Sequence, residues 1–590
     1  MAESIISPGV FARENDISFI APAPVEASTA LIGPTVKGPY ERPTIVTSYN
    51  QFVRTFGTTF TSGSVSQEFI TSVAAKNFFD QGGSSLLVAR VQSGSFTAAS
   101  SSFISASSNV SPDSGSAFVL RTHDQGSIAN GYEGDVYNNN DELTGAAMKS
   151  GSEDNLRWEV TQRNTAKGTF SLIIRRGDDT HSNKIILETF SNLSLDPNSD
   201  RYIEKVIGNQ FTSVADDGTS KYIKTSGDQV NKSKYVYVHA VNLKTINYLA
   251  NDGVTINNDT DGVSFQHSLP LVDSGSFSGA NGEIAPAGML MDESISNTNT
   301  QGLLDTSDRT YYKDMISVLS NKDEYVFNVI SAPGLVYEFA KHKIVLDELI
   351  SMVETRGDCI AAIDLVGYSK DTSEIVTQAN GLNSSYAAAY WPWVQMPLST
   401  GKNRFMPAST IIPGVYAFND SSAAPWFAPA GLVRGGVVGV IQAEQKLTRA
   451  QRDTLYEGKI NPIATFPGAG IAVFGQKTLQ TKASALDRVN VRRLLINLKK
   501  FLGDQANNLV FEQNTVATRN NFLAAVNPYL ESVVQRQGLF AFRVVMDDTN
   551  NTADVVDRNQ LVGQIFIQPA KTAEFIVLDF TIEPTGATFS

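Results

Sequence analysis

Phe575-Ile-Val-Leu-Asp-Phe-Thr-Ile-Glu-Pro584 is an apolar, β-prone segment close to the last residue of the 590-residue chain. No later segment of the sequence is suited to cover its edge. An uncovered edge strand either promotes aggregation or pairs with another chain. We therefore expect this segment to dock onto a neighbouring copy of the protein, which indicates a polymer-forming structural role and not an enzyme.

The C-terminal region that contains this segment begins with Phe466-Pro-Gly-Ala-Gly-Ile-Ala-Val-Phe-Gly475. Gly468 and Gly470 match the first two glycines of a dinucleotide-binding fingerprint, but Val473 stands where the third glycine is needed. The residues that follow have a strand-like pattern, whereas the fingerprint requires a helix. We therefore interpret this glycine-rich segment as a plain turn.

A basic helix is predicted after Gly475. Apolar residues recur at helical spacing and form one stripe, which consists of Val491, Leu494, Leu495, Leu498 and Leu502. The basic residues off this stripe are Arg488, Arg492, Arg493, Lys499 and Lys500. Two interpretations stay open: a solvated helix face, or a face that docks electrostatically on an acidic partner.

Composition limits the class of protein. The net charge of -13 argues against nucleic-acid binding as the main role, because phosphate contacts need a basic surface. The single cysteine, Cys359, excludes an internal disulfide and favours folding in a reducing cytoplasm. No run of the sequence approaches the roughly 18 apolar residues of a membrane helix, and Met1-Ala-Glu-Ser does not begin a secretion signal.

The residue composition and the helix and strand pattern of the sequence change twice along the chain. Helix-like and strand-like segments alternate over residues 21–91 and again over 311–465, which predicts a mostly parallel sheet covered by helices. Residues 92–310 are rich in Ser, Gly, Asn, Asp and Thr and contain short strands, which indicates one or two β-rich insertions. We therefore expect a multidomain fold of the α/β and α+β classes, in which one discontinuous core domain carries the insertion.

The expected domains are an N-terminal arm (1–20), the core domain in two parts (21–91 and 311–465), the inserted β-rich region (92–310), a C-terminal α+β domain (466–570) and a C-terminal arm strand (571–590).

The sequence contains no recognisable catalytic, cofactor or metal motif. The five histidines, at positions 123, 181, 239, 267 and 342, are scattered singly, without a partner at metal-ligand spacing. The acidic pairs Asp178-Asp179 and Asp547-Asp548 are typical of solvated turns. We predict no catalytic residue, no cofactor and no metal.

Several short segments together resemble the contractile tail sheath proteins of myovirus-type, T-even-like bacteriophages. They are Ser7-Pro-Gly-Val-Phe-Ala-Arg-Glu14, Leu31-Ile-Gly-Pro34, Lys37-Gly-Pro39, Asn77-Phe-Phe-Asp-Gln-Gly-Gly-Ser84, Arg90-Val91, Tyr386 to Val394, Pro413-Gly-Val-Tyr-Ala417, Pro425 to Gly431, Asn461-Pro-Ile463 and Phe511 to Ile582. Residues 92–310 match least, in the part where such sheaths carry variable protruding domains.

The resemblance implies a subunit that stacks in hexameric rings, forms a helical tube around the tail tube and contracts to drive that tube through the host envelope. It implies that terminal arms add strands to the C-terminal sheet of adjacent subunits. The donor residues would be Val10, Phe11, Ala12, Arg13, Glu14, Phe575, Ile576, Val577, Leu578, Phe580 and Ile582, and the receiving residues Leu539, Phe540, Phe542, Val544, Ile565 and Ile567.

The same resemblance implies the partners and the location. The partners would be further copies of the chain, the tail tube protein, and the baseplate and tail terminator proteins, with no nucleic acid and no membrane insertion. The subunit would be made in the host cytoplasm and incorporated into the virion. Arg488, Arg492, Arg493, Lys499 and Lys500 are the candidates for contact with the tube.

Three other interpretations stay open. The nearest is the sheath of a bacterial contractile injection system, such as a tailocin or a secretion apparatus. An enzyme built on residues 311–465 would need a convergent polar site, and an adhesin would bind the host through residues 92–310.

Overall fold

The computed structural model describes residues 25–574, apart from 41, 63–64, 94–96, 105–115, 126–155, 178, 181, 219, 281–294, 302 and 304–308. The predicted donor segments, residues 10–14 and 575–582, lie outside the described residues.

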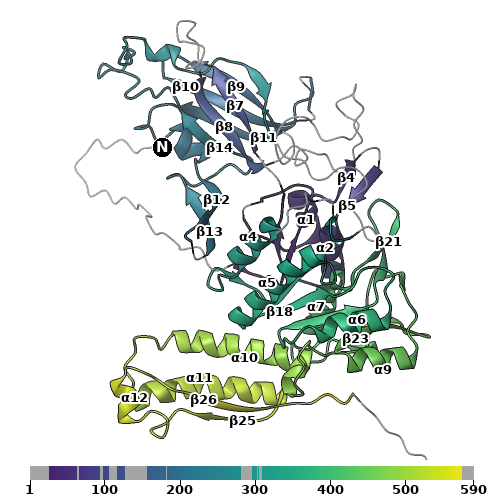
Figure 1. The fold of residues 1–590 in the computed structure, drawn as a ribbon. Helices are drawn as coiled ribbons and strands as arrows, with labels where there is room; N and C mark the ends of the chain where they lie inside the picture. The colour runs from purple at the N-terminus through teal and green to yellow at the C-terminus, as the bar shows by residue number, and fades with distance from the viewer. Residues whose placement is uncertain are drawn as a thin grey trace, which may run out of the picture.

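An eight-stranded sheet forms the centre of the molecule (Figure 1). Its order is β24 (Gly470–Val473), β23 (Ile460–Phe466), β19 (Ala387–Trp391), β18 (Ile360–Asp364), β17 (Val329–Val336), β2 (Thr29–Gly33), β6 (Leu86–Arg90) and β3 (Thr44–Val46). The six inner strands are parallel and the two edge strands antiparallel. The predicted mostly parallel sheet is therefore present, and it unites residues before and after the β-rich region.

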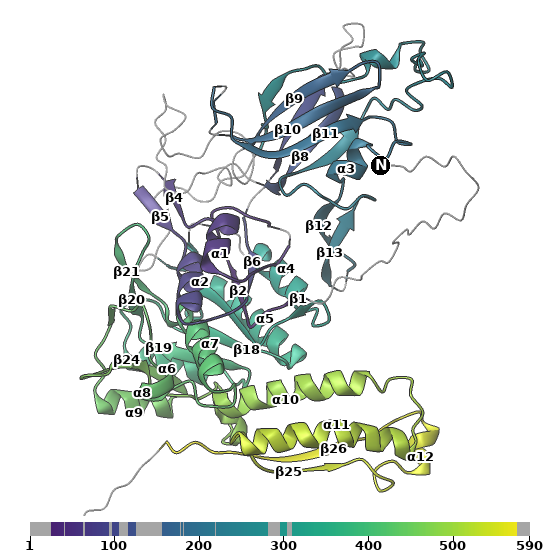
Figure 2. The ribbon, with the colours of Figure 1, turned by 180° about the vertical axis from the view of Figure 1, so that it is seen from behind.

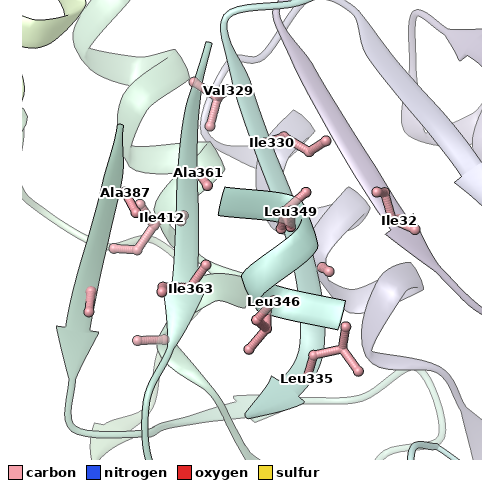
Figure 3. Close-up of a cluster of buried hydrophobic side chains, with 14 of the residues drawn as sticks. Ile32, Val329, Ile330, Leu335, Leu346, Leu349, Ala361, Ile363, Ala387 and Ile412 are labelled. Atoms are coloured by element: carbon pink, nitrogen blue, oxygen red, sulfur yellow. The ribbon is translucent and has the colours of Figure 1, made fainter. Parts of the chain in front are cut away.

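Helices cover both faces of this sheet. One face contacts α1 (Tyr49–Phe56), α2 (Ile70–Asp80) and α7 (Ile412–Ser422), and the other contacts α4 (Thr310–Leu319) and α5 (Ala340–Arg356). In Figure 3, Leu346 and Leu349 of α5 lie against the strands that carry Ile330 and Ile363. Burial on both faces explains why these strands are continuous apolar runs without alternation.

Smaller elements surround the sheet. Near its β23 end lie α6 (Thr372–Asn380), α8 (Gly431–Arg434), α9 (Arg449–Glu457), β20 (Val394–Pro397), β21 (Asn403–Met406) and β22 (Gln442–Ala443). Two short pairs complete this part of the chain, namely β1 (Val25–Glu26) with β16 (Tyr325–Val326), and β4 (Thr59–Ser62) with β5 (Val65–Glu68).

The glycine-rich segment is the predicted turn. It connects β23 to β24, and both Gly468 and Gly470 have positive φ angles, of 77° and 81°. Such angles favour glycine because it has no Cβ. Because β24 closes the central sheet, the expected start of the C-terminal domain at residue 466 is too early.

The β-rich region has a core of its own, and the views from both sides place it at one end of the molecule (Figures 1 and 2). One sheet contains β11 (Ile186–Ser194), β10 (Thr169–Arg176), β9 (Leu156–Asn164) and β15 (Ser274–Ser276), and another β14 (Val236–Val241), β8 (Ser116–Gln125) and β7 (Ala98–Ile104). A short helix, α3 (Ile203–Ile207), contacts β11 and β14.

A hairpin connects the β-rich region to the central sheet's helices. It consists of β12 (Phe211–Asp216) and β13 (Lys221–Ser226), and Val214 and Ile223 pack against the central core. The ammonium of Lys221 lies 2.7 Å from the carboxylate of Asp314 in α4.

The C-terminal unit lies at the opposite end of the molecule from the β-rich region (Figure 2). It consists of α10 (Val489–Asn507), α11 (Val516–Gln535), β25 (Leu539–Val545), α12 (Ala553–Asp557) and β26 (Gln564–Pro569). Its apolar core includes Leu494, Phe522, Leu530 and, from the central part of the chain, Trp426.

Candidate intersubunit interface

The residues predicted to receive strands lie in an antiparallel pair, with Phe542 opposite Ile567 and Val544 opposite Ile565. Within the described residues, β25 and β26 pair only with each other. Each strand therefore has an outer edge whose backbone groups are not used in a described sheet. A two-stranded sheet by itself is only marginally stable in water. This sheet therefore depends on the helices behind it, and its outer edges are suited to pairing with further strands.

One face of the pair is apolar and covered by the helices. Five of the six predicted receiving residues pack on the core of the C-terminal unit, namely Leu539, Phe542, Val544, Ile565 and Ile567. The opposite face carries Phe540 and Phe566, which are 72% and 57% exposed. An irregularity in the pairing between Leu539 and Ala541 directs Phe540 away from the covered face.

The basic residues of α10 do not form the expected solvent-facing surface. Arg492 and Arg493 are only 4% and 3% exposed. The Arg492 guanidinium lies 3.9 Å from the centre of the Tyr386 ring and donates a hydrogen bond to Ser385. The expectation that these two arginines face a partner is therefore wrong for the described chain, because both are covered by the central part of the molecule.

Arg493 has its own set of buried partners. Its guanidinium donates to the carboxylate of Asp420 at 2.5 Å and lies 4.6 Å from the Tyr416 ring centre. The Tyr416 hydroxyl in turn lies 2.6 Å from that of Tyr390 in β19. Hydrogen bonds between charged groups are stronger than those between neutral groups, especially when they are shielded from water.

Arg492 and Arg493 are buried because α10 packs against two cores. Leu494 and Leu498 belong to the core of the C-terminal unit, as the apolar stripe predicts. Val489 and Ile496 belong to the central core on the other side of the helix. The sequence pattern did not reveal this second face, because its polar part is arginine. The rings that cover Arg492 and Arg493 belong to Tyr386 and Tyr416, which lie far earlier in the chain.

The remaining three basic candidates differ in their exposure and in their contacts. Lys499 is exposed, and its ammonium donates to the Tyr386 hydroxyl at 3.3 Å. Lys500 is half-buried. Arg488, directly before α10, makes ion pairs with Asp487 at 3.0 Å and with Glu574 at 2.7 Å. Of the five candidates, Lys499 is therefore the one with an exposed side chain.

No three His, Cys, Asp or Glu side chains among the described residues converge as metal ligands would. Buried His342 accepts a hydrogen bond at Nδ1 from the backbone N–H of Val336, and its Nε2 lies 2.8 Å from the Thr300 hydroxyl. These are contacts that hold a core together. None of the described helices has the length and apolar character to cross a membrane.

Two families match the chain in consecutive segments. Residues 312–479 match the phage tail sheath protein central domain, and residues 481–583 match the phage tail sheath C-terminal domain. These two segments belong to the phage tail sheath family. The border between the two sheath domains falls at residue 480, between β24 and α10, in agreement with the position of β24 in the central sheet.

Individual sheath proteins extend this result. The chain is 42% identical to the tail sheath protein of Vibrio phage KVP40 over 189 residues, which is 32% of this chain and 28% of that protein. It is 39% identical to the tail sheath protein of Enterobacteria phage T4, again over 32% of this chain and 28% of the relative. The matches thus span less than a third of these two relatives, both from T-even-like myoviruses.

A solved structure resembles almost the whole chain. The crystal structure of a sheath tail protein from Listeria innocua matches with a TM-score of 0.51 at 9% sequence identity, over 92% of this chain and 95% of that one. The identity is low, so this match bears on the fold alone. It supports a mixed α/β sheath fold for the chain.

Proposed function

We propose that the chain is the structural subunit of a contractile phage tail sheath, which polymerises as stacked hexameric rings around a tail tube and contracts to drive that tube through the host envelope. The observation that carries the proposal is the match of two consecutive sheath domains over residues 312–583. A second support is the two-stranded receiving sheet, whose outer edges are not used by the described chain.

The proposed link between subunits is strand exchange. Residues 10–14 and 575–582 of neighbouring copies would extend the sheet of β25 and β26, with main-chain hydrogen bonds joining the chains. Side-chain alternation favours one register: Ile576, Leu578, Phe580 and Ile582 share one face of an extended strand and suit the covered side of the sheet. A head-to-tail contact that does not close on itself produces a helical filament.

The domain division follows from the same evidence. We place the N-terminal arm at 1–24, the discontinuous central domain at 25–93 and 309–480, the protruding β-rich domain between these two parts, and the C-terminal domain at 481–574. Residues 575–590 form the C-terminal arm. Because α10 packs on both the central and C-terminal cores, these two domains would move as one body while the arms keep neighbours connected during contraction.

The other proposed partners are the tail tube, baseplate and tail terminator proteins, and the subunit would reside in the virion. Lys499 is the candidate for a weak contact with the tube, since its charge is exposed. An exposed charge contributes little energy and is screened by salt, so such a contact could release during contraction.

Electron microscopy of the purified protein at increasing concentration tests the function. We expect hollow, striated tubes from the full chain and folded subunits without tubes from a chain that ends at residue 574. A chain that ends at Pro584 keeps the strand segment and serves as the matched control, which should form tubes. Normal tubes from the chain that ends at 574 would refute strand exchange, and a monodisperse monomer from the full chain at all concentrations would refute the polymer.

A further inference from the structure

The chain between β26 and the C-terminal arm is held by specific contacts. After β26, the backbone N–H of Ala570 donates to the carbonyl oxygen of Gly538 at 3.1 Å. Residues 571–574 then leave the sheet without forming a strand. Gln476 donates through Nε2 to the Thr572 hydroxyl at 2.6 Å and to Glu574 Oε1 at 3.0 Å.

Arg488 binds Glu574 with two parallel hydrogen bonds. Its Nε donates to Oε1 at 2.7 Å and its Nη2 donates to Oε2 at 3.0 Å. A two-point contact between guanidinium and carboxylate fixes direction as well as distance. The two side chains are 25% and 18% exposed, so water screens this pair less than it screens a surface ion pair.

The surroundings favour the ionised carboxylate. Burial opposes ionisation of Glu574, yet the hydrogen bonds from Arg488, Gln476 and Tyr456 together hold the pKa of its carboxyl below the ordinary value. The Tyr456 ring also stabilises two neighbouring cations through cation–π contacts. The Arg488 guanidinium lies 5.8 Å and the Lys477 ammonium 4.4 Å from its centre.

These contacts lie at the junction of the two sheath domains. Gln476 follows β24 of the central sheet, and Arg488 directly precedes α10. The backbone joins them, since the N–H of Val489 donates to the carbonyl oxygen of Gln476 at 2.8 Å. Gln476 itself is 3% exposed, so the base of this site is buried.

We propose that Arg488 and Gln476 form a clamp on Glu574 that fixes the point at which the C-terminal arm leaves its own subunit. This inference rests on the proposed strand exchange and names the residues that position the arm for the second copy. The donor segment Phe575–Ile582 begins directly after the clamp. Fully extended, its residues span about 25 Å, so the receiving sheet of the neighbour must begin close to the clamp.

The clamp strengthens assembly by limiting the arm's freedom. A segment that already points in one direction loses less conformational entropy when it pairs. Without the clamp, residues 571–574 join the free segment, and a longer tether lowers the effective concentration of the arm near its target. Arg488 is thus a positioning residue for the arm.

The test compares critical concentrations for tube formation, measured by sedimentation. We expect Glu574→Ala and Arg488→Ala each to raise the critical concentration about tenfold, with unchanged far-UV circular dichroism. The exchange variant Arg488→Glu with Glu574→Arg should bring the critical concentration most of the way back to that of the unchanged chain. A general structural defect in the single variants would not be repaired in this way. Asp554→Ala is the matched control, because it breaks an exposed ion pair with Arg558 in the same unit, at 2.7 Å, and should have no effect.

The outcomes separate the clamp from the proposed function. If the single variants assemble as the unchanged chain does, while the chain ending at 574 forms no tubes, the clamp is rejected and strand exchange stands. If the exchange variant is no better than the single variants, the specific pairing is rejected. If the chain ending at 574 assembles normally, strand exchange itself fails, whatever the single variants do.

Discussion

The guanidinium of Arg493 in α10 lies 2.5 Å from the carboxylate of Asp420 in α7, and this contact joins the C-terminal unit to the central domain. The Arg493 side chain is 3% exposed and that of Asp420 is 27% exposed. A second contact supports the same junction: the Trp426 indole donates to the carbonyl oxygen of Arg536 at 3.1 Å. The two domains are therefore connected by buried polar contacts as well as by apolar packing.

Replacing Arg493 tests whether this junction stabilises the fold. We expect Arg493→Ala to lower the free energy of unfolding by about 2–4 kcal/mol, because it leaves Asp420 without its counter-charge and removes the contact with Tyr416. Urea unfolding followed by tryptophan fluorescence measures the loss. Lys499→Ala, on the exposed part of the same helix, should change stability by no more than about 0.5 kcal/mol. Equal stability of the two variants would contradict the buried junction.

Asp364 should make stability depend on pH. Burial raises the pKa of its carboxyl to about 7, against hydrogen bonds from the Ser409 backbone N–H and hydroxyl. Between the unfolded value of 3.8 and about 7 the folded chain holds a proton that the unfolded chain has lost. The contribution of this group to stability is thus complete below that window and decreases as pH rises through it.

The matching variant is Asp364→Asn, which cannot ionise and keeps an acceptor for Ser409. We expect the unchanged chain to lose about 1–3 kcal/mol more than the variant between pH 5 and pH 8. Thermal or urea unfolding at a series of pH values measures this difference. Parallel pH profiles for the two chains would show that Asp364 does not titrate in this range.

Lys499→Glu tests the proposed contact with the tail tube. Assembly on purified tubes should weaken at low ionic strength, because the exposed charge is reversed, and the effect should fade as salt screens it. Lys322→Glu makes the same charge change at an exposed position in the central domain and serves as control. If both variants assemble on tubes equally well at low salt, Lys499 does not face the tube.

Local patterns in the sequence predicted much of the fold. The alternating helices and strands of the central part, the turn at Gly468 and the apolar stripe through Leu494 and Leu498 all depend on neighbours close in the chain. Hydrophobic periodicity records such local preferences directly.

The basic helix shows where this reasoning stops. Arg492 and Arg493 have the pattern of a solvated face, but Tyr386 and Tyr416 cover them. The clamp on Glu574 depends in the same way on residues 86 and 98 positions away in sequence, at Arg488 and Gln476. Nothing in a local window distinguishes a cation that will meet water from one that will meet a distant ring or carboxylate.

By itself, the sequence determined the alternation of helices and strands, the resemblance to sheath proteins and the strand-like residue pattern of Phe575–Ile582, because each depends on short-range pattern or composition. Tertiary structure alone decided that β24 closes the central sheet, that α10 is buried on two sides, and that Arg488 holds Glu574. The physical reason is that a charged side chain has no fixed environment until folding brings its partners together, and burial then decides whether it is surface or core.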